Sequence, residues 1–168
     1  MLLSIKSDVD IVKLQLYSGS SLVSPVESKK RFNHFKKFEL NKNQHIFLAE
    51  MCRSNGLKYL ASVWDLDMLK WIDKYLDYYK IGSGDLTAYP IIKEFALRGK
   101  PIILSTGATK FSEITNSIKY LKKNGCKKLF VLKCSSIYPS RLCDLNLKAL
   151  EKISRLNCVA GFSDHSLG

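Results

Sequence analysis

Six short apolar segments recur along the chain, and each of the first five is followed by a stretch with helical spacing. Two of them, residues 101–104 and 129–132, are apolar throughout, which is typical of strands buried on both faces of a parallel sheet. The other four lie at residues 11–17, 58–63, 78–81 and 158–162. Strands that alternate with helices in this way predict an α/β fold with a parallel sheet, either a barrel or a doubly wound sheet.

Polar side chains recur where the later strands end, at Ser83, Ser105, Ser135 and Ser163. Because active sites of (β/α)8 barrels lie at the carboxyl ends of the strands, this pattern favours the barrel. A doubly wound dinucleotide-binding sheet would need Gly-x-Gly-x-x-Gly after its first strand, and the sequence has none there. We predict a (β/α)8 TIM-barrel type domain over residues 1–168, incomplete because only about six of its eight strands are present.

Residues 80–85 carry the densest group of chemically useful side chains. Gly82 and Gly84 permit a tight turn and a close approach of the backbone to a ligand. Lys80, Ser83 and Asp85 add a cation, a hydroxyl and a carboxylate. The set suits an anion such as phosphate with an acid–base group beside it. A polar turn between a strand and a helix would carry the same residues, so the segment alone leaves both interpretations open.

The formal net charge of +12 has three possible sources: nucleic-acid binding, an anionic substrate, or solvated lysine-rich helix faces. The lysines are spread along the chain and no block is rich in arginine, which favours solvated faces. Hydrophobic residues make up 46% of the chain, as in a folded globular domain. We therefore expect a globular protein with no nucleic-acid partner.

The cysteines and the start of the chain indicate its compartment. The five cysteines are scattered and form no Cys-x-x-Cys pair, so we expect reduced thiols and a cytoplasmic protein. Lys6 interrupts the apolar start of the chain before a signal sequence forms. No run reaches the roughly 20 apolar residues of a membrane span, so we expect no membrane partner.

The first third of the chain supports three local expectations. Residues 18–37 are polar, and we expect a loop there. Asn41 and Gln44 have the spacing of a helix capping box, and Gly56 is a suitable end for that helix. His34 and His45 fall in stretches expected at the surface, and we assign them no function.

Taken together and in order, the strand-end motifs resemble those of the sialic acid synthases. These enzymes condense phosphoenolpyruvate with an N-acylmannosamine-type sugar, giving a nine-carbon 2-keto sugar acid and phosphate. The resemblance runs from about residue 11 to residue 168 and places the chain on the second to seventh strands of the barrel. The matching stretches are residues 12–15, 79–87, 99–107, 134–139, 144–147 and 161–168.

The resemblance implies a substrate site. Lys80, Ser83 and Ser105 match positions that hold phosphoenolpyruvate, and a cation with two hydroxyls suits its phosphate. Lys13 matches a lysine that faces the same ligand, and Gln15 is a candidate for the sugar side. The further substrate contacts implied by the match are Ser136, Tyr138 and Ser163.

The resemblance also implies a metal and an acid–base group. His165 matches one of two histidines that bind a divalent metal, expected to be Mn²⁺, with Mg²⁺ as the alternative. By itself His165 would more often be a buried structural histidine, and its place in Ser-Asp-His-Ser after an apolar strand favours the ligand. The metal would polarise the open-chain sugar aldehyde for attack by C3 of phosphoenolpyruvate. Asp85 matches an acidic position that acts as an acid–base group on the water that adds at C2.

On the same alignment several parts of a synthase are missing. The chain lacks the first strand with its acidic sugar-binding residue, and the eighth strand with the second metal histidine. It also lacks the C-terminal antifreeze-like domain. We expect the full-length parent to be a homodimer and the 168-residue chain to be inactive alone.

Two departures from the family pattern leave the acceptor sugar open. Residues 62–64 read Ser-Val-Trp where many members have Ser-Thr-Pro, and we expect Trp64 to pack. Lys133 replaces a histidine and is more like the pseudaminic acid branch, whereas Gly-Ser-Gly-Asp at residues 82–85 matches the sialic and legionaminic branches. The alternatives are a legionaminic or pseudaminic acid synthase, or a non-catalytic anion-binding fragment of such an enzyme.

Overall fold

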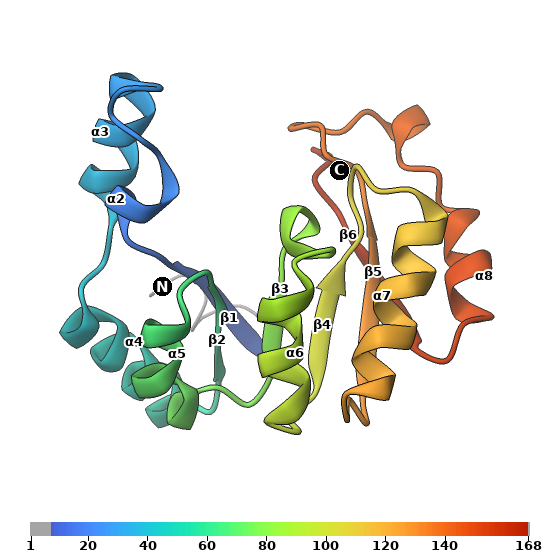
Figure 1. Cartoon of the computed structure of the whole chain (residues 1–168), viewed down its shortest axis with the longest axis horizontal. Coiled ribbons are helices and arrows are strands. Elements are labelled where there is room, and N and C mark those ends of the chain that lie inside the picture. Colours follow the sequence, from blue (N-terminus) through green and yellow to red (C-terminus); the bar gives the residue numbers. More distant parts are fainter. Residues whose placement is uncertain (1–7, 168) are drawn as a thin grey trace. The chain divides into compact units, whose positions relative to one another are not determined.

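The structure is a computed structural model that describes residues 8–167. Its elements form two compact units, one ending at Asp77 and one beginning at Tyr78. Within each unit every strand pair is parallel, and helices connect successive strands (Figure 1). This arrangement confirms the predicted α/β fold with parallel strands.

The first unit contains one pair of parallel strands and their helices. Lys13 in the first strand lies opposite Leu60, and Gln15 lies opposite Ser62. The elements of this unit are β1 (Ile11–Leu16), α2 (Gly19–Leu22), α3 (Lys29–Phe38), α4 (Lys42–Ser54), β2 (Lys58–Val63), α5 (Leu66–Ile72) and the 3₁₀ turn η1 (Asp73–Tyr75).

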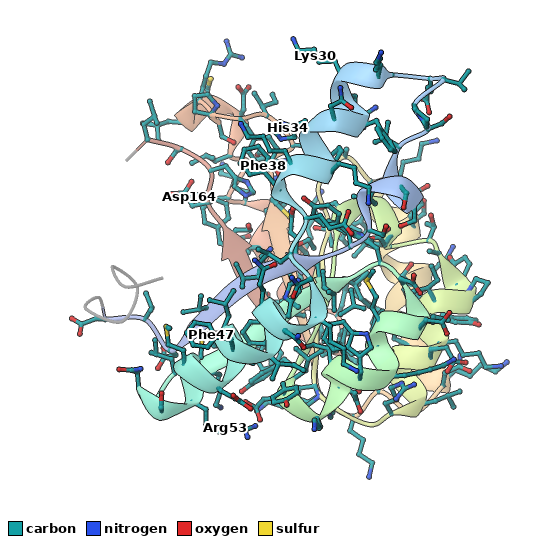
Figure 2. All side chains as sticks on the ribbon, turned by 90° about the vertical axis from the view of Figure 1, so that its left-hand side faces the viewer. Lys30, His34, Phe38, Phe47, Arg53 and Asp164 are labelled. Carbon is teal, nitrogen blue, oxygen red and sulfur yellow. The ribbon has the colours of Figure 1, made fainter. Side chains whose placement is uncertain are left out.

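The expectation of a loop over residues 18–37 is wrong, because most of that stretch forms α2 and α3. Phe32, Phe35 and Phe38 recur every third residue, which keeps them on one side of a helix. Ser28 caps α3 by accepting a hydrogen bond from a backbone N–H of the first turn. The helix is nevertheless largely solvated: Figure 2 shows Lys30, His34 and Phe38 along it, and none of its residues is buried.

The helix signals further along the first unit are confirmed. The Asn41 side chain accepts from the Gln44 N–H at 3.0 Å, and the Gln44 side chain accepts from the Asn41 N–H at 2.8 Å. Gly56 follows α4 in the left-handed region, with φ of +73°. Both ends of α4 are therefore set by local sequence, as a capping box and a glycine stop require.

The expected surface position of His45 is wrong. Its side chain is fully buried, and Nδ1 lies 2.6 Å from the Tyr59 hydroxyl of β2. Burial lowers the pKa of His45 and raises that of Tyr59. His45 fills the space between α4 and β2 as a neutral core residue, which explains why a polar side chain interrupts the apolar face of the helix.

The second unit carries four consecutive parallel strands. Its elements are β3 (Tyr79–Ile81), the 3₁₀ turn η2 (Ser83–Asp85), α6 (Tyr89–Leu97), β4 (Ile102–Ser105), α7 (Phe111–Lys123), β5 (Leu129–Cys134), the 3₁₀ turn η3 (Leu142–Asp144), α8 (Ala149–Ser154) and β6 (Val159–Ser163). Each strand hydrogen-bonds to the next one in the chain, so the carboxyl ends of β3 to β6 lie along one edge.

The two faces of this sheet differ in burial. Tyr79, Ile81, Leu104 and Val131 share one face and are buried, and α6 and α7 lie side by side in contact with each other (Figure 1). The residues that alternate with these form the second face. Within residues 8–167, no helix is long and apolar enough to cross a membrane.

Candidate functional site

The register of the sheet puts several predicted site residues on one face. Lys80 lies opposite Ile103 and Ser105 opposite Leu132, so both side chains project from the face that the helices do not cover. Cys134 and Ser163 pair across β5 and β6 on the same face. The sequence prediction that these strand ends converge is therefore consistent with the geometry of this unit.

Lys80 and Ser105 are in direct contact. The Lys80 ammonium donates to Ser105 Oγ at 2.5 Å and to the Ile81 carbonyl at 2.9 Å. Ser105 is buried, while Lys80 keeps partial exposure toward the open face. Because Ser105 Oγ accepts from the cation, its own hydrogen points elsewhere and can be donated to a ligand.

Ser83, Gly107 and Ser136 form a second contact group from three different strand ends. The Gly107 N–H donates to Ser83 Oγ at 2.8 Å. A methyl group on Gly107 would overlap Ser136 Oγ and lie 3.1 Å from Ser83 Oγ, so both hydroxyls lie against the bare glycine. Together with Lys80 and Ser105, this group offers one cation and three hydroxyls, which suits an oxyanion.

Cys134 lies behind this group and packs. It is buried, its Sγ accepts from the Thr106 N–H at 3.3 Å, and it lies 3.8 Å from Ser83 Oγ. The Thr106 hydroxyl donates to the Leu132 carbonyl at 2.9 Å, which holds the end of β4 against β5. These contacts fix the loop that carries Gly107.

Asp85 ends the 3₁₀ turn η2 and is half-buried. The turn folds its carboxylate back toward Gly82, where an added Cβ would lie 3.1 Å from Asp85 Oδ2. The Asp85 N–H donates to the Gly82 carbonyl at 3.1 Å and closes the turn. The carboxylate is thereby held one short turn away from Ser83.

Tyr138 and His165 lie together on the loops that follow β5 and β6. Their ring centroids are 4.4 Å apart, and the Ser140 N–H donates to the His165 carbonyl at 2.9 Å. Nδ1 of His165 is buried and has no hydrogen-bond partner. A metal ligand leaves such a nitrogen when its ion is absent, but Nε2 of the core residue His45 is also buried without a partner, so the feature fits a metal ligand without identifying one. Within residues 8–167, however, no three His, Cys, Asp or Glu side chains are grouped to hold a metal.

The other predicted substrate residues, Lys13 and Gln15, belong to the first unit. They project from the same face of β1 and line a cavity of about 370 Å³ with Leu14, Tyr17, Phe38 and Leu40. Surrounding protein lowers the pKa of Lys13 by desolvation, although much of the side chain stays exposed. In this unit Trp64 packs as expected, with its ring 6.0 Å from that of Tyr17.

The Lys133 side chain points to the opposite face of the sheet from the side chains of Lys80 and Ser105. It lies opposite Phe162 in the register, on the face away from Lys80 and Ser105. Its ammonium donates to the Cys134 carbonyl at 2.9 Å and to Ser135 Oγ at 3.5 Å. The side chain is therefore separated by the sheet from the hydroxyl cluster.

Sequence reasoning missed the part played by Gly107. It was noted only as the end of a motif, yet its N–H orients Ser83 and its missing side chain admits Ser136. The available signal was its position directly after a strand end, where a glycine allows close approach of other groups.

The chain is similar to curated proteins along almost its whole length. It is 34% identical to an uncharacterised protein of Methanocaldococcus jannaschii over 97% of this chain and 48% of that protein. It is 30% identical to the N,N'-diacetyllegionaminic acid synthase of Campylobacter jejuni over 96% of this chain and 53% of the synthase. The chain thus spans about half the length of these relatives.

A solved structure gives the same picture for the fold. The N-acetylneuraminic acid (sialic acid) synthetase of Leptospira borgpetersenii, in complex with citrate, superposes with a TM-score of 0.91 at 27% identity. The match covers 98% of this chain and 57% of that chain, so the fold is part of a TIM barrel of this type. The model of the NeuB family matches residues 2–168. The chain belongs to the NeuB family.

Proposed function

We propose that the chain carries the phosphoenolpyruvate site of a sialic acid synthase-type enzyme that makes a nine-carbon 2-keto sugar acid. One observation carries the proposal: Lys80, Ser105, Ser83 and Ser136 converge from three neighbouring strand ends around Gly107. Family membership and the names of the similar synthases support the same chemistry.

In this proposal the phosphate of phosphoenolpyruvate lies on the serine cluster. Lys80 would neutralise part of its charge, and Ser83 and Ser105 would donate hydrogen bonds to its oxygens. Both serine oxygens already accept from protein donors, so each hydroxyl hydrogen would be the group that binds the ligand. Ser136, Tyr138 and Ser163 would contact the rest of the substrate. Lys13 and Gln15 of the first unit stay proposed substrate residues on the resemblance alone.

The bond-forming step joins C3 of phosphoenolpyruvate to the aldehyde carbon of the open-chain sugar. Water then adds at C2, and Asp85 would accept its proton as general base. The C2–O bond to phosphate breaks, phosphate leaves, and C2 becomes the keto carbon of the product. The chain's groups hold the phosphate in place throughout, so positioning is their main contribution.

We propose His165 as one ligand of a divalent metal, with Mn²⁺ preferred to Mg²⁺ because the donor is an imidazole nitrogen. Its buried Nδ1 without a partner fits this role. One nitrogen does not hold a metal, so the other ligands would come from outside the described residues. When bound, the metal would supply Lewis-acid polarisation of the sugar aldehyde.

The acceptor would be N-acetylmannosamine or a related N-acyl sugar, with legionaminic and pseudaminic acid precursors as the alternatives. The test is a phosphate-release assay on the full-length protein with phosphoenolpyruvate, Mn²⁺ and each acceptor in turn, with product identified by mass spectrometry. We expect release with one acceptor class and a mass equal to the sum of the substrates and water less phosphate. Absence of release with every acceptor would contradict the synthase proposal.

A non-catalytic anion-binding role is the second candidate. It is favoured by the single metal-ligand candidate among the described residues. Calorimetry with phosphoenolpyruvate separates the two: binding without turnover by the full-length protein supports the second candidate, and no binding refutes both.

A further inference from the structure

A cavity of about 770 Å³ lies in the second unit, outside the serine cluster. It is bounded by the loop between β4 and α7, the first turn of α7, the end of β5, and α8. Its size is that of a small-molecule site. We propose that this cavity binds a phosphorylated sugar, a role that goes beyond the proposed synthase site and does not depend on it.

The charges on the cavity favour an anion. Lys110, Lys133 and Lys152 line it, against one carboxylate, Glu113. The Glu113 side chain is already engaged, because it accepts from the Lys110 backbone N–H at 2.7 Å and caps α7. An ammonium has three hydrogens, and Lys133 uses two of them on Cys134 and Ser135, which leaves one for a ligand. A concave wall with excess positive charge concentrates the field on a bound anion.

The rest of the lining fits a sugar body better than a bare anion. Ile114 and Ile153 form a buried apolar floor, and the ring of Phe111 is 45% exposed at the start of α7. An exposed aromatic ring can stack on the C–H face of a sugar, and the Asn146 amide can pair with its hydroxyls. An inorganic phosphate would occupy only a small part of this volume.

The backbone beside the cavity is left-handed at two residues that are not glycine. Ala108 and Asn146 adopt φ of 53° and 45°, and within residues 8–167 they are the two non-glycine residues with positive φ. Both line this cavity. Left-handed backbone at an alanine is unfavourable and clusters at binding sites in folded proteins. The left-handed backbone is a second observation that points to this cavity, and it is independent of the lysines.

The cavity is a neighbour of the serine cluster and separate from it. Ser83, Ser105 and Ser136 do not line it, whereas Thr106 and Cys134 do. The Thr106 N–H donates to Cys134 Sγ, and Cys134 Sγ contacts Ser83 Oγ. A ligand in the cavity would therefore rest against the two residues that hold the Gly107 loop.

The test is an amide NMR titration of the 168-residue chain with glucose 6-phosphate as a representative hexose phosphate. The chain carries Lys80→Met, which weakens the proposed phosphoenolpyruvate site, and binding is read at amides that line the cavity. We expect saturable shifts at the Ala108 and Asn146 amides, with weaker binding of inorganic phosphate and none of glucose. Lys152→Ala should weaken binding about tenfold, as for loss of one charge-assisted hydrogen bond.

The matched control is Lys119→Ala, an exposed lysine of α7 outside the cavity, which should leave the affinity unchanged. Three results would overturn the proposal. They are no saturable shift at millimolar glucose 6-phosphate, equal weakening by the control variant, or inorganic phosphate binding as tightly as the sugar phosphate. Since binding is read at the Ala108 and Asn146 amides, which line the cavity, none of these results bears on the synthase proposal.

Discussion

At the scale of single residues, the candidate site depends on one cation. Lys80 supplies the ammonium that contacts Ser105, and its side chain is half-buried. Lys80→Met keeps most of the stem and removes the charge. We expect the affinity for phosphoenolpyruvate to fall about tenfold or more, from a charged hydrogen bond of about 1.5–3 kcal/mol. Calorimetry measures this affinity. The control is Lys93→Met, which changes an exposed lysine of α6. Equal affinity of the two variants for phosphoenolpyruvate would refute the role of Lys80.

Gly107 carries the second prediction at this scale. A methyl group there overlaps Ser136 Oγ and presses on Ser83, so Gly107→Ala should displace both hydroxyls. We expect phosphoenolpyruvate binding to weaken about tenfold while the fold persists, because the neighbours are side-chain ends that can rotate. Calorimetry and circular dichroism together check this. Lys93→Met on α6, outside the serine cluster, is again the control, and unaltered binding in Gly107→Ala would contradict the prediction.

These residues also show what sequence can predict about the site. Lys80, Ser83 and Ser105 could be found because strand ends of a parallel sheet share one edge, whatever the details of packing. Gly107 contributes a backbone N–H and an absent side chain, and its position after a strand end does not say which hydroxyls approach it. His45 was missed for a related reason, since burial of a polar residue depends on a partner 14 positions away, Tyr59.

At the scale of elements, α2 and α3 of the first unit depend on a close backbone approach. Gly19 lies so near α3 that an added Cβ would be 2.8 Å from the Lys36 nitrogen and 3.0 Å from its Cα. Backbone atoms cannot rotate away, so Gly19→Ala should separate the two helices. It would also disturb the Gly19 N–H bond to Glu39, which is the main cause of the lowered pKa of that carboxyl. We expect a loss of about 1–3 kcal/mol in the unfolding free energy.

Urea denaturation checks this prediction. Gly84→Ala serves as the control, because the space around Gly84 is open and its backbone is not left-handed. It should change the unfolding free energy by less than about 0.5 kcal/mol. A Gly19→Ala variant as stable as this control would show that α2 and α3 do not pack as described.

The contact of α4 with β2 makes the first unit sensitive to acid. Burial lowers the pKa of His45 in the folded chain, whereas the unfolded chain binds this proton near pH 6.5. The unfolded state therefore binds more protons below that pH. The free energy of unfolding should stay constant above about pH 6.5. Below that pH it should decrease by at most about 1.4 kcal/mol per pH unit, until the pH reaches the lowered pKa of His45.

Urea denaturation at pH 7.5 and at pH 5.5 measures the effect, at values chosen to lie about one unit on either side of the unfolded pKa. His45→Gln should flatten the pH dependence, and His34→Gln, which changes an exposed histidine, should leave it as in the parent. Equal slopes in all three proteins would mean that His45 does not titrate on unfolding.

The error at residues 18–37 also belongs to the scale of elements. Five lysine and arginine residues lie between Lys29 and Phe38, and they made the segment resemble a solvated loop. The three phenylalanines at every third position carry the helix instead, through contacts such as that of Phe35 with Tyr17, at a centroid distance of 5.6 Å. Strands and their order could be predicted because their apolar runs are continuous. A helix that packs only along one narrow edge has no such continuous run, so α3 could not be predicted in this way.

At the scale of the whole molecule, the chain matches about half the length of its curated relatives. The described residues contain the hydroxyl cluster and a single metal-ligand candidate. We therefore expect the 168-residue chain to bind phosphoenolpyruvate but to release no phosphate with Mn²⁺ and any N-acyl sugar. Calorimetry and a phosphate assay on the same sample check both parts. Turnover by this chain would show that it needs no further residues.

The direction of Lys133 has a consequence for comparing synthases by sequence. By resemblance alone, lysine at the position that precedes the Cys-Ser-Ser-Ile-Tyr-Pro motif is more like the pseudaminic acid branch, whereas residues 82–85 are more like the sialic and legionaminic branches. The side chain lies across the sheet from Lys80 and Ser105 and belongs to the wall of the lysine-lined cavity. Variation at this position would then record what occupies that cavity, and a classification built on it would group enzymes by their second ligand while the acceptor sugar varied independently.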